Sequence, residues 1–502
     1  MKIKNYKPLI PDSTIASRIE SFLFYSLVFL IPTQLGKHFW PDFAYVRGIR
    51  IDYLSPTVYL TDLLVLFIFV LWLPRAFGKG SRANLKLKTK NLKKSKLFLF
   101  LMFIVVFLVI NILISGRRLG SLYSLFKLLE MAFVAYYSAK FIVSKNIFQK
   151  IIFALSFGAI TESVIAITQF LNKGSIGRLL YFLGERSFNS GTPGIANASL
   201  NGELVLRAYG TLPHPNVLAG YLLVAMILVL FSLKFQKLKK EAGSKKQEAS
   251  LVQRMINLII LNSSFLIQAT TLALGTIALF LTMSRIAIVA WMVVLIWFWI
   301  SRLIPPLEKD EEAQLYGRIE HDAFWNLKKD RFKIKMAVVL IFISGIISIF
   351  IFSPIGSRFT NIKTNDEAIV QRTTLIDSSV KMIGKSPLIG VGLGQFLPSL
   401  AEIQKPLTTS TYLQPVHNIF LLVAAETGLI GLGLFIWFLT KTFYKVRSQK
   451  SEVRSTLLIV LSAILIIGIF DHYWLTLQQG QLLFAFVIGL CWIKVKNKNY
   501  LK

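Results

Sequence analysis

The sequence contains little cysteine, few acidic side chains and little charge overall. One cysteine in 502 residues excludes an intrachain disulfide and a cysteine-based metal cluster. Charged residues make up 16% of the chain, against about 25% in soluble domains. Hydrophobic residues make up 54%, with 40 Phe, and the mean hydropathy is +0.60. This composition excludes disordered, collagen-like and disulfide-stapled chains, and it indicates a membrane protein.

Apolar runs of the length that crosses a bilayer, about 20 residues, recur along the chain. Twelve such runs lie at about 20–36, 58–74, 97–114, 119–138, 151–171, 214–233, 257–282, 286–303, 336–353, 417–440, 455–471 and 476–493. None alternates as a lipid-facing barrel strand does. We therefore expect an all-α polytopic membrane protein with about twelve transmembrane helices.

The basic residues are distributed unevenly between the two sides of this topology. With the N-terminus inside, 40 of the 57 Lys and Arg lie in cytoplasmic segments and 16 in outer ones. This asymmetry follows the positive-inside rule and predicts that both termini are cytoplasmic, with an uncleaved N-terminal anchor. The net charge of +32 raises nucleic-acid binding as an alternative, but the stretch Lys86–Lys96 is better suited to anionic lipid.

Two predicted outer loops are long, at 172–213 and 354–416, and both contain apolar as well as charged residues. Such loops are usually functional or disordered, and this composition favours ordered ones. The predicted organisation is N-terminal helices and the first part of an outer loop over 1–199, a core over 200–440, and C-terminal helices over 441–502.

The first informative polar segment, Arg207-Ala-Tyr-Gly-Thr-Leu-Pro-His-Pro-Asn216, leads into the sixth span. Asn216 is a suitable N-cap and the preceding proline suits a helix start. On this structural interpretation Arg207 is only a surface charge. Thr282-Met-Ser-Arg285 is predicted to form the tight outer turn between the seventh and eighth spans, where a lone arginine is typical of a snorkelling anchor.

His417 lies at the outer end of the tenth span, and the predicted topology puts Arg207, Arg285 and Arg372 on the same face. A lone loop histidine is usually incidental, but histidine can accept a proton near neutral pH. Arginine forks match phosphate oxygens and keep their charge. No spacing of Asp, Glu or His indicates a metal site. This set suits displacement of a diphosphate, in which the arginines stabilise the leaving group while histidine deprotonates an attacking hydroxyl.

Three other features have structural interpretations. Gly390-Val-Gly-Leu-Gly394 lacks the Lys-Ser/Thr of a phosphate-binding loop and predicts a tight turn. Glu426 is half a helical turn out of phase with His417, so on a continuous helix it faces away and needs another polar partner. Lys127 and Glu130 are three residues apart and are predicted to pair.

These segments resemble the O-antigen ligase family, which includes O-antigen polymerases and protein O-oligosaccharyltransferases. The resemblance rests on Gly210–Asn216 with Leu218-Ala219, on Leu281–Arg285, and on Ser386–Gly394 followed by His417-Asn418, Gly428 and Gly431. The spacing His-Asn-x9-Gly-x-x-Gly is its most specific part. It covers roughly residues 200–440.

The resemblance implies a GT-C-like fold and transfer of a glycan from undecaprenyl diphosphate to an acceptor, with no cofactor and no metal. The site would lie on the outer (periplasmic) face of the bacterial cytoplasmic (inner) membrane, in a pathway of polysaccharide or lipopolysaccharide synthesis. Its partners would be the lipid-linked donor, a glycan, lipid or protein acceptor and the bilayer, but no nucleic acid. By motif, His417 is the base, Arg207, Arg285 and Arg372 bind the diphosphate, and His214, Asn216 and Asn418 support them.

Several functions stay open at this point. A ligase and a polymerase of this family differ only in the acceptor, which the motifs do not specify. A transporter or flippase also fits twelve spans, although no pair of Gly/Pro-interrupted spans indicates the repeated halves of many carriers. A membrane scaffold gives no reason for arginines and a histidine to gather on one face.

Overall fold

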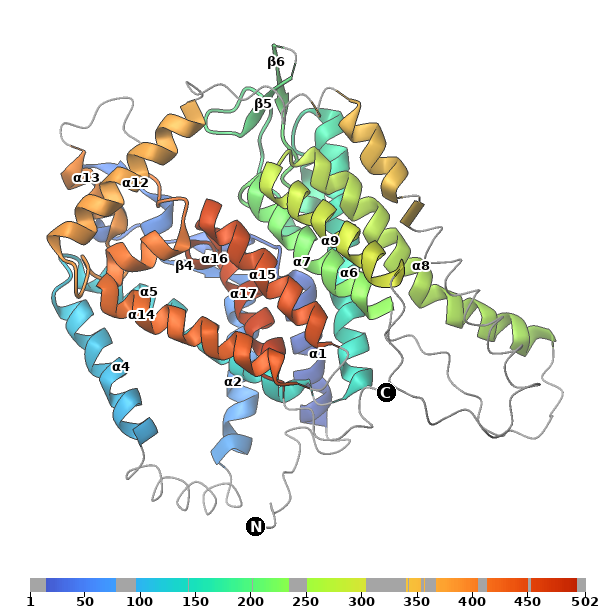
Figure 1. Ribbon diagram of the computed structural model, residues 1–502, viewed down its shortest axis with the longest axis horizontal. Helices are drawn as coiled ribbons and strands as arrows, with labels where there is room; N and C mark the ends of the chain where they lie inside the picture. The colour runs from blue at the N-terminus through green and yellow to red at the C-terminus, as the bar shows by residue number, and fades with distance from the viewer. Residues whose placement is uncertain are drawn as a thin grey trace.

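The fold was analysed in a computed structural model of the chain (Figure 1). The structure describes residues 15–77, 96–142, 144–200, 202–233, 251–303, 340–341, 343–353, 356, 367–404, 413–449 and 453–493. The basic stretch before Lys96 and most of the charged inner loops lie outside these residues. The prediction that this stretch faces lipid stays a prediction.

Helices dominate the chain, and a helix overlaps each of the twelve predicted apolar runs. The first six are α1 (Ile15–Leu30), α2 (Leu60–Phe77), α4 (Lys96–Leu113), α5 (Arg118–Phe141), α6 (Lys145–Asn172) and α7 (Pro215–Ser232). The later ones are α8 (Leu251–Leu281), α9 (Arg285–Leu303), α12 (Glu367–Lys385), α13 (Phe396–Ile403), α14 (Ile419–Arg447), α15 (Arg454–Phe470), α16 (Tyr473–Thr476) and α17 (Gln478–Cys491). Residues 343–351 are also helical.

Five helices are long and apolar enough to cross a membrane, at Arg118–Phe141, Asn146–Asn172, Pro215–Ser232, Ser264–Leu281 and Ile419–Arg447. The predicted class, a mostly helical membrane protein, is therefore confirmed. Twelve spans and cytoplasmic termini remain predictions.

Short antiparallel strand pairs occur only in segments predicted to lie outside, among the described residues. In the first outer loop, β1 (Gly36–His38) pairs with β4 (Thr57–Tyr59), and β2 (Tyr45–Val46) pairs with β3 (Ile49–Arg50). The 3-10 turns η1 (Asp42–Ala44) and η2 (Asp52–Leu54) lie between them. The loop at 172–213 is folded, with the 3-10 helix η3 (Arg178–Leu183) and the hairpin of β5 (Asn197–Leu200) and β6 (Glu203–Leu206).

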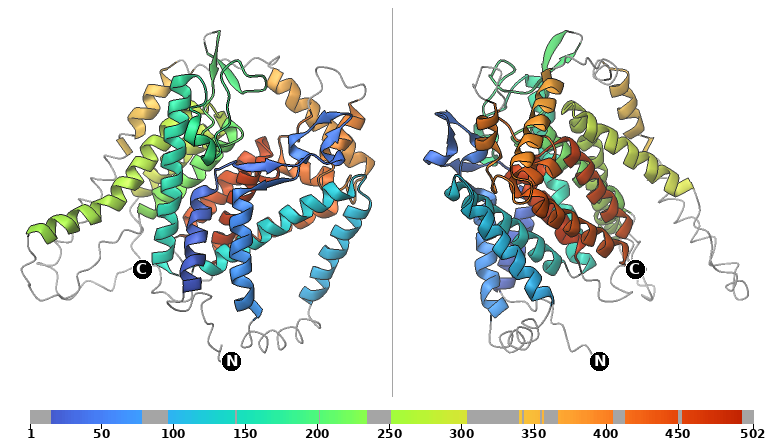
Figure 2. Two further views of the ribbon diagram at one scale, coloured as in Figure 1. Left: turned by 180° about the vertical axis from the view of Figure 1, so that it is seen from behind. Right: turned by 60° about the vertical axis from the view of Figure 1, so that its left-hand side comes forward.

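The elements predicted to lie outside are together at one end of the helices. Figure 1 shows β5 and β6 projecting beyond the helix ends at the top, with α12 and α13 also in the upper part. In the left view of Figure 2, the blue strands of the first outer loop lie above the upper ends of α1 and α2 and reach toward α13, which β2 contacts. The polar groups analysed below belong to this end.

The centre of the bundle is α7. Every residue from Val217 to Ser232 is buried, because α7 packs against α6, α8, α9, α15 and α17. A helix that is apolar on all sides belongs in such an interior. The start of α7, next to the outer loops, is thereby held in a fixed position.

A buried charged cluster joins α2, α5 and α17. The Nζ atom of Lys127 lies 2.8 Å from Asp62 Oδ2 and 3.1 Å from Glu130 Oε2, so the predicted Lys127–Glu130 pair is present, with a third partner. Gln478 Nε2 donates to Asp62 Oδ1 and to Glu130 Oε1. Gln478, a polar interruption of the last apolar run, therefore satisfies two buried carboxylates.

The glycine run at 390–394 is the predicted tight turn, and it pairs with a break in α14. Gly428 has φ 65° and ψ −173°, which is not helical. The N–H groups of Val391 and Gly392 donate to the carbonyls of Ala425 and Glu426, at 2.9 Å each. On the other side of the break, the N–H of Leu429 donates to the carbonyl of Pro387. Backbone groups released by the break thus find partners, as they must inside a membrane protein.

Glu426 has the polar partners expected of an intramembrane carboxylate, although His417 precedes the N-cap of α14 and is not on the same helix. Its side chain accepts a hydrogen bond from the backbone N–H of Phe396, at the start of α13, and one from Gly394. It makes no contact with His417 among the described residues. The carboxylate therefore anchors the glycine turn.

We expect Gly428→Ala to destabilise the protein strongly. A Cβ at this residue would lie 2.2 Å from the Leu388 carbonyl carbon, and the positive φ would add strain of about 1–3 kcal/mol. Thermal unfolding in detergent measures the loss. Gly433→Ala on the same helix is the matched control, since nothing lies within 4 Å of its added Cβ; equal stability of the two variants would contradict the assignment.

Candidate functional site

Arg207 lies at the end of β6, where the chain runs along the turn between α8 and α9. The N–H of Ala208 donates to the carbonyl of Leu281 at 3.1 Å, and Arg207 Nε donates to the carbonyl of Thr282 at 2.7 Å. The half-buried guanidinium also donates from an Nη atom to Asn216 Oδ1 at 2.6 Å. Arg207 is thus held by two elements rather than extending into solvent as a surface charge.

Buried polar side chains of α6 hold the segment that follows Arg207. Glu162 accepts hydrogen bonds from the N–H of Thr211 at 2.7 Å and from its hydroxyl at 2.6 Å. Gln169 accepts from the N–H of Gly210 and donates to its carbonyl. Gly210 has φ 64°, and a Cβ there would lie 2.2 Å from a Glu162 oxygen. The close fit explains why glycine stands in this part of the motif.

Arg285 is the first residue of α9, directly after the turn that Arg207 contacts. The predicted tight turn is present, with α8 ending at Leu281 and Met283 at φ 53°. The Nε atom of Arg285 is buried and has no hydrogen-bond partner among the described residues. Since a buried N–H without a partner is costly, this guanidinium is suited to receive an anionic ligand.

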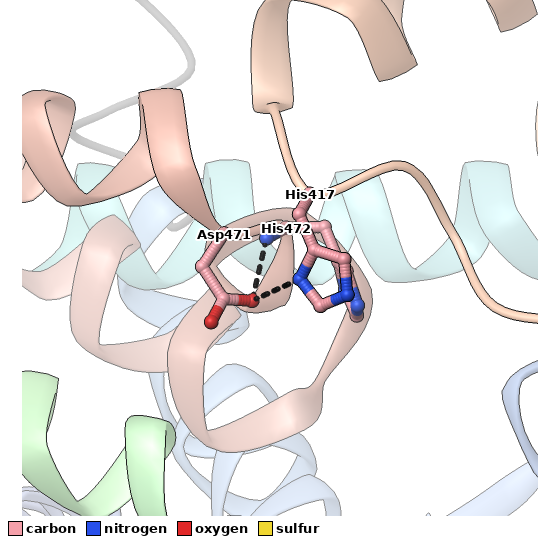
Figure 3. A group of neighbouring side chains, drawn as sticks. All are labelled: His417, Asp471 and His472. Atoms are coloured by element: carbon pink, nitrogen blue, oxygen red, sulfur yellow. Dashed lines mark hydrogen bonds and ion pairs between the residues drawn. The ribbon is translucent and has the colours of Figure 1, made fainter. Parts of the chain in front are cut away.

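His417 lies just before α14 and faces Asp471, which follows α15 (Figure 3). The His417 Nδ1 atom is 3.5 Å from Asp471 Oδ1, and the same oxygen accepts a hydrogen bond from the N–H of His472 at 2.8 Å. Asn418 caps α14, because its Oδ1 accepts from the N–H groups of Phe420 and Leu421. The cap fixes the point at which the chain enters α14, directly after His417.

Asn216 connects Arg207 to the Asp471 carboxylate. While its Oδ1 accepts from Arg207, its Nδ2 donates to Asp471 Oδ2 at 2.8 Å. The prediction that Asn216 is the N-cap of α7 was wrong. His214 is the cap, its Nδ1 accepting from the N–H of Asn216, and Pro215 takes the first helical position. Asn216 lies two residues beyond the cap, so its side chain is available for the contact with Asp471.

Arg372 is not part of this group of residues. It lies on an exposed stretch of α12, and within the described residues it has no hydrogen bond or ion pair with Arg207, Arg285 or His417. The structure therefore brings together Arg207, His214, Asn216 and His417, with Arg285 beside them in the turn that Arg207 contacts. Arg372 stays apart.

Two residues of the group, Asp471 and His472, were not predicted as site residues. Asp471 is buried, which by itself would raise its pKa. The His417 ring, whose Nδ1 lies 3.5 Å from the carboxylate, and the His472 and His214 rings nearby instead hold the pKa of Asp471 below its usual range. Burial lowers the pKa of His472 to about 3, although the Asp471 carboxylate opposes this. Burial and the charge of Arg207 also lower the pKa of His214. Both rings are neutral near pH 7.

His417, Asp471 and His472 could also offer ligand atoms to a metal ion, since one atom from each lies within 4.8 Å of the others. However, both Asp471 oxygens already accept hydrogen bonds, from His472 and Asn216. Asn216 in turn holds the Arg207 guanidinium, whose charge repels a cation. These contacts favour an Asp–His pair over a metal site.

Acidification is expected to destabilise the protein through His472. Its pKa is about 3 in the folded protein, whereas an exposed histidine in the unfolded chain titrates near about 6.5. Between these values the unfolded chain binds more protons than the folded protein does. The neutral His472 ring therefore contributes its full share of the stability above about pH 6.5, and this share falls as the pH falls toward 3. The melting temperature in detergent should drop between about pH 7 and about pH 5, and drop less in His472→Asn. The same pH dependence in both proteins would contradict this.

Comparison with known proteins finds a family match over a segment that contains part of this site. Residues 270–436 match a family model described as O-antigen ligase. No curated protein matches the chain. The matched segment contains Arg285 and His417, whereas Arg207 precedes it and Asp471 follows it. The resemblance that the motifs predict is therefore confirmed over residues 270–436, and the chain is a multi-pass membrane protein with an O-antigen ligase-like region.

Proposed function

We propose that the protein is a membrane glycosyltransferase that moves a glycan from undecaprenyl diphosphate to an acceptor hydroxyl. The observation that carries this proposal is the connection of Arg207 to His417 through Asn216 and Asp471. Through these contacts a cationic group, Arg207, and a candidate base, His417, belong to one site, although they are far apart in the sequence. The family match supports the reaction class.

The charge of the site suits an anionic leaving group. The Arg207 guanidinium is linked to the Asp471 carboxylate through Asn216, and the Arg285 Nε has no partner among the described residues. A diphosphate would satisfy such donors with charge-assisted hydrogen bonds. Arg207 is already oriented by Thr282 and Asn216, so little side-chain entropy is lost when the ligand binds.

In the proposed reaction the acceptor hydroxyl oxygen attacks the anomeric carbon of the glycan, and the bond from that carbon to the diphosphate oxygen breaks. The hydroxyl proton passes to Nε2 of His417, while Nδ1–H faces Asp471. This carboxylate selects the tautomer and stabilises the imidazolium that forms. The diphosphate leaves with both electrons of the broken bond, and the arginines stabilise its charge.

The same proposal puts the site at the outer face of the bacterial cytoplasmic membrane. The basic residues favour a cytoplasmic side opposite the outer loops. The site residues come from the outer-end loops and helix ends, next to the β5–β6 hairpin, where a lipid-linked diphosphate at the membrane surface can reach them. The acceptor is a second lipid-linked unit in a polymerase and a different molecule in a ligase.

Replacing His417 by Ala should lower kcat by about 10²- to 10⁴-fold, the range of a general base. Asp471→Asn should also lower kcat, because the imidazole loses the carboxylate that orients it, with little change in the KM of the donor. The assay uses protein reconstituted in liposomes with an undecaprenyl diphosphate-linked glycan, and it measures release of undecaprenyl diphosphate.

His38→Gln is the matched control, because His38 is an exposed outer histidine that stacks on Trp40 and makes no contact with His417 among the described residues. It should retain activity, and a chelator should not lower the activity of the unmodified protein. If His417→Ala were as active as His38→Gln, His417 would not be the base. If a chelator abolished activity, the metal alternative would replace the Asp–His pair.

A further inference from the structure

Four large side chains at the outer end of α6 form what we call the apolar rim: Leu171, Leu179, Tyr181 and Phe182. Their exposed fractions are 73%, 79%, 62% and 67%. Leu179 and Phe182 are three residues apart in the 3-10 helix η3, so they project from the same side. The Tyr181 and Phe182 rings also lie edge to face, with their centroids 5.8 Å apart. Large exposed apolar side chains gathered in this way mark a surface that another apolar phase covers.

This exposure is fixed by the surrounding structure. Glu185 accepts hydrogen bonds from the N–H groups of Ile176 at 2.8 Å and Gly177 at 2.7 Å, just before η3. At the other end of η3, the hydroxyl of Thr33 donates to the carbonyl of Leu183 at 2.6 Å. The segment is held at both ends while its apolar side chains point outward.

The rim continues the lipid-facing side of α6. The exposed large apolar residues of that helix are Phe153, Phe157, Val164 and Leu171. At about 100° per residue these four positions fall within about 40° of one another, whereas Glu162 lies on the opposite side. The exposed stripe of a membrane-spanning helix contacts acyl chains. The apolar rim lies at the end of this stripe, at Leu171.

The charges beside the rim are basic. Lys173 and Arg178 are exposed, and Glu185, the one carboxylate in the sequence from 171 to 190, is buried and accepts three hydrogen bonds. Aromatic and basic side chains together are typical of the headgroup level of a membrane. Their charge complements an anionic lipid.

We infer that the apolar rim inserts into the outer leaflet of the membrane, with Lys173 and Arg178 on anionic phospholipid headgroups. The segment that carries the rim also contacts the loop before the site, since Arg186, three residues after η3, donates to the carbonyl of Pro213, the residue before His214, at 2.8 Å. Its depth in the membrane therefore sets the height of the site above the acyl chains. This inference does not depend on the proposed reaction.

Site-directed spin labelling tests it, because the single native cysteine, Cys491, is buried and can be replaced by Ala. Single cysteines are placed by Leu179→Cys or Phe182→Cys, with Leu204→Cys on the β6 hairpin as the matched exposed control. The labelled proteins are reconstituted in vesicles of zwitterionic phospholipid with or without phosphatidylglycerol. Power saturation then measures the access of oxygen, which concentrates in lipid, and of a water-soluble nickel complex.

Labels at both rim positions should be reached by oxygen several-fold more than by nickel, and the label at 204 should show the reverse. Phosphatidylglycerol should lower nickel access at the rim, and Lys173→Gln with Arg178→Gln should remove that difference. Nickel access at 179 and 182 equal to that at 204 would overturn the inference. Protection from both reagents would also overturn it, because the rim would then be covered by protein.

Discussion

The site depends on one buried carboxylate. Asp471 accepts hydrogen bonds from Asn216 and from the backbone of His472, and it faces the His417 ring. Without it, the half-buried His417 imidazole and Asn216 amide would lose the acceptor that orients them, and α7, α14 and α15 would lose their shared polar contact. A buried carboxylate is costly unless its oxygens are satisfied, and here both oxygens are.

Around this carboxylate, two glycine-containing segments fix the backbone that carries the proposed reactive groups. Gly210 lets the Arg207 segment approach the Glu162 carboxylate, and Gly428 lets α14 break against the turn at 387–392. In both cases a polar side chain inside the bundle, Glu162 or Glu426, satisfies backbone N–H groups of an outer loop. The intramembrane acids thus have structural reasons to be where they are.

Much of this was predictable from local patterns. Apolar length located the helices, and motif spacing selected Arg207, Arg285 and His417, because each stands in a recognisable turn or helix start. The polar partners expected for Glu426 are also present, but the phase premise is not met, because His417 precedes the N-cap of α14 and is not on the same helix. Arg372 was placed on the same face by topology alone; the structure has it exposed on α12, without a hydrogen bond or ion pair to the other site residues among those described, and its role stays a prediction.

The remaining features depend on contacts that a local pattern does not contain. Asp471 and Asn216 are 255 residues apart, and in sequence Asp471 is merely the end of an apolar run. Asn216 resembled an N-cap because its residue type fits, but α7 begins at Pro215, two residues earlier than such a cap implies, with His214 as the cap. A criterion of apolar length also misses α12, whose buried positions Leu375, Ser378, Ser379 and Met382 follow helical spacing in a mainly polar segment.

The central claim is that this outer-face site consumes a diphosphate-linked glycan, and lipid analysis in cells tests it most directly. The measurement is mass spectrometry of undecaprenyl diphosphate-linked glycans in a strain lacking the protein, compared with the complemented strain. The account predicts accumulation on the lipid: long chains if the protein is a ligase, single repeat units if it is a polymerase. An unchanged lipid pool, in a strain with no second enzyme for the step, would contradict it.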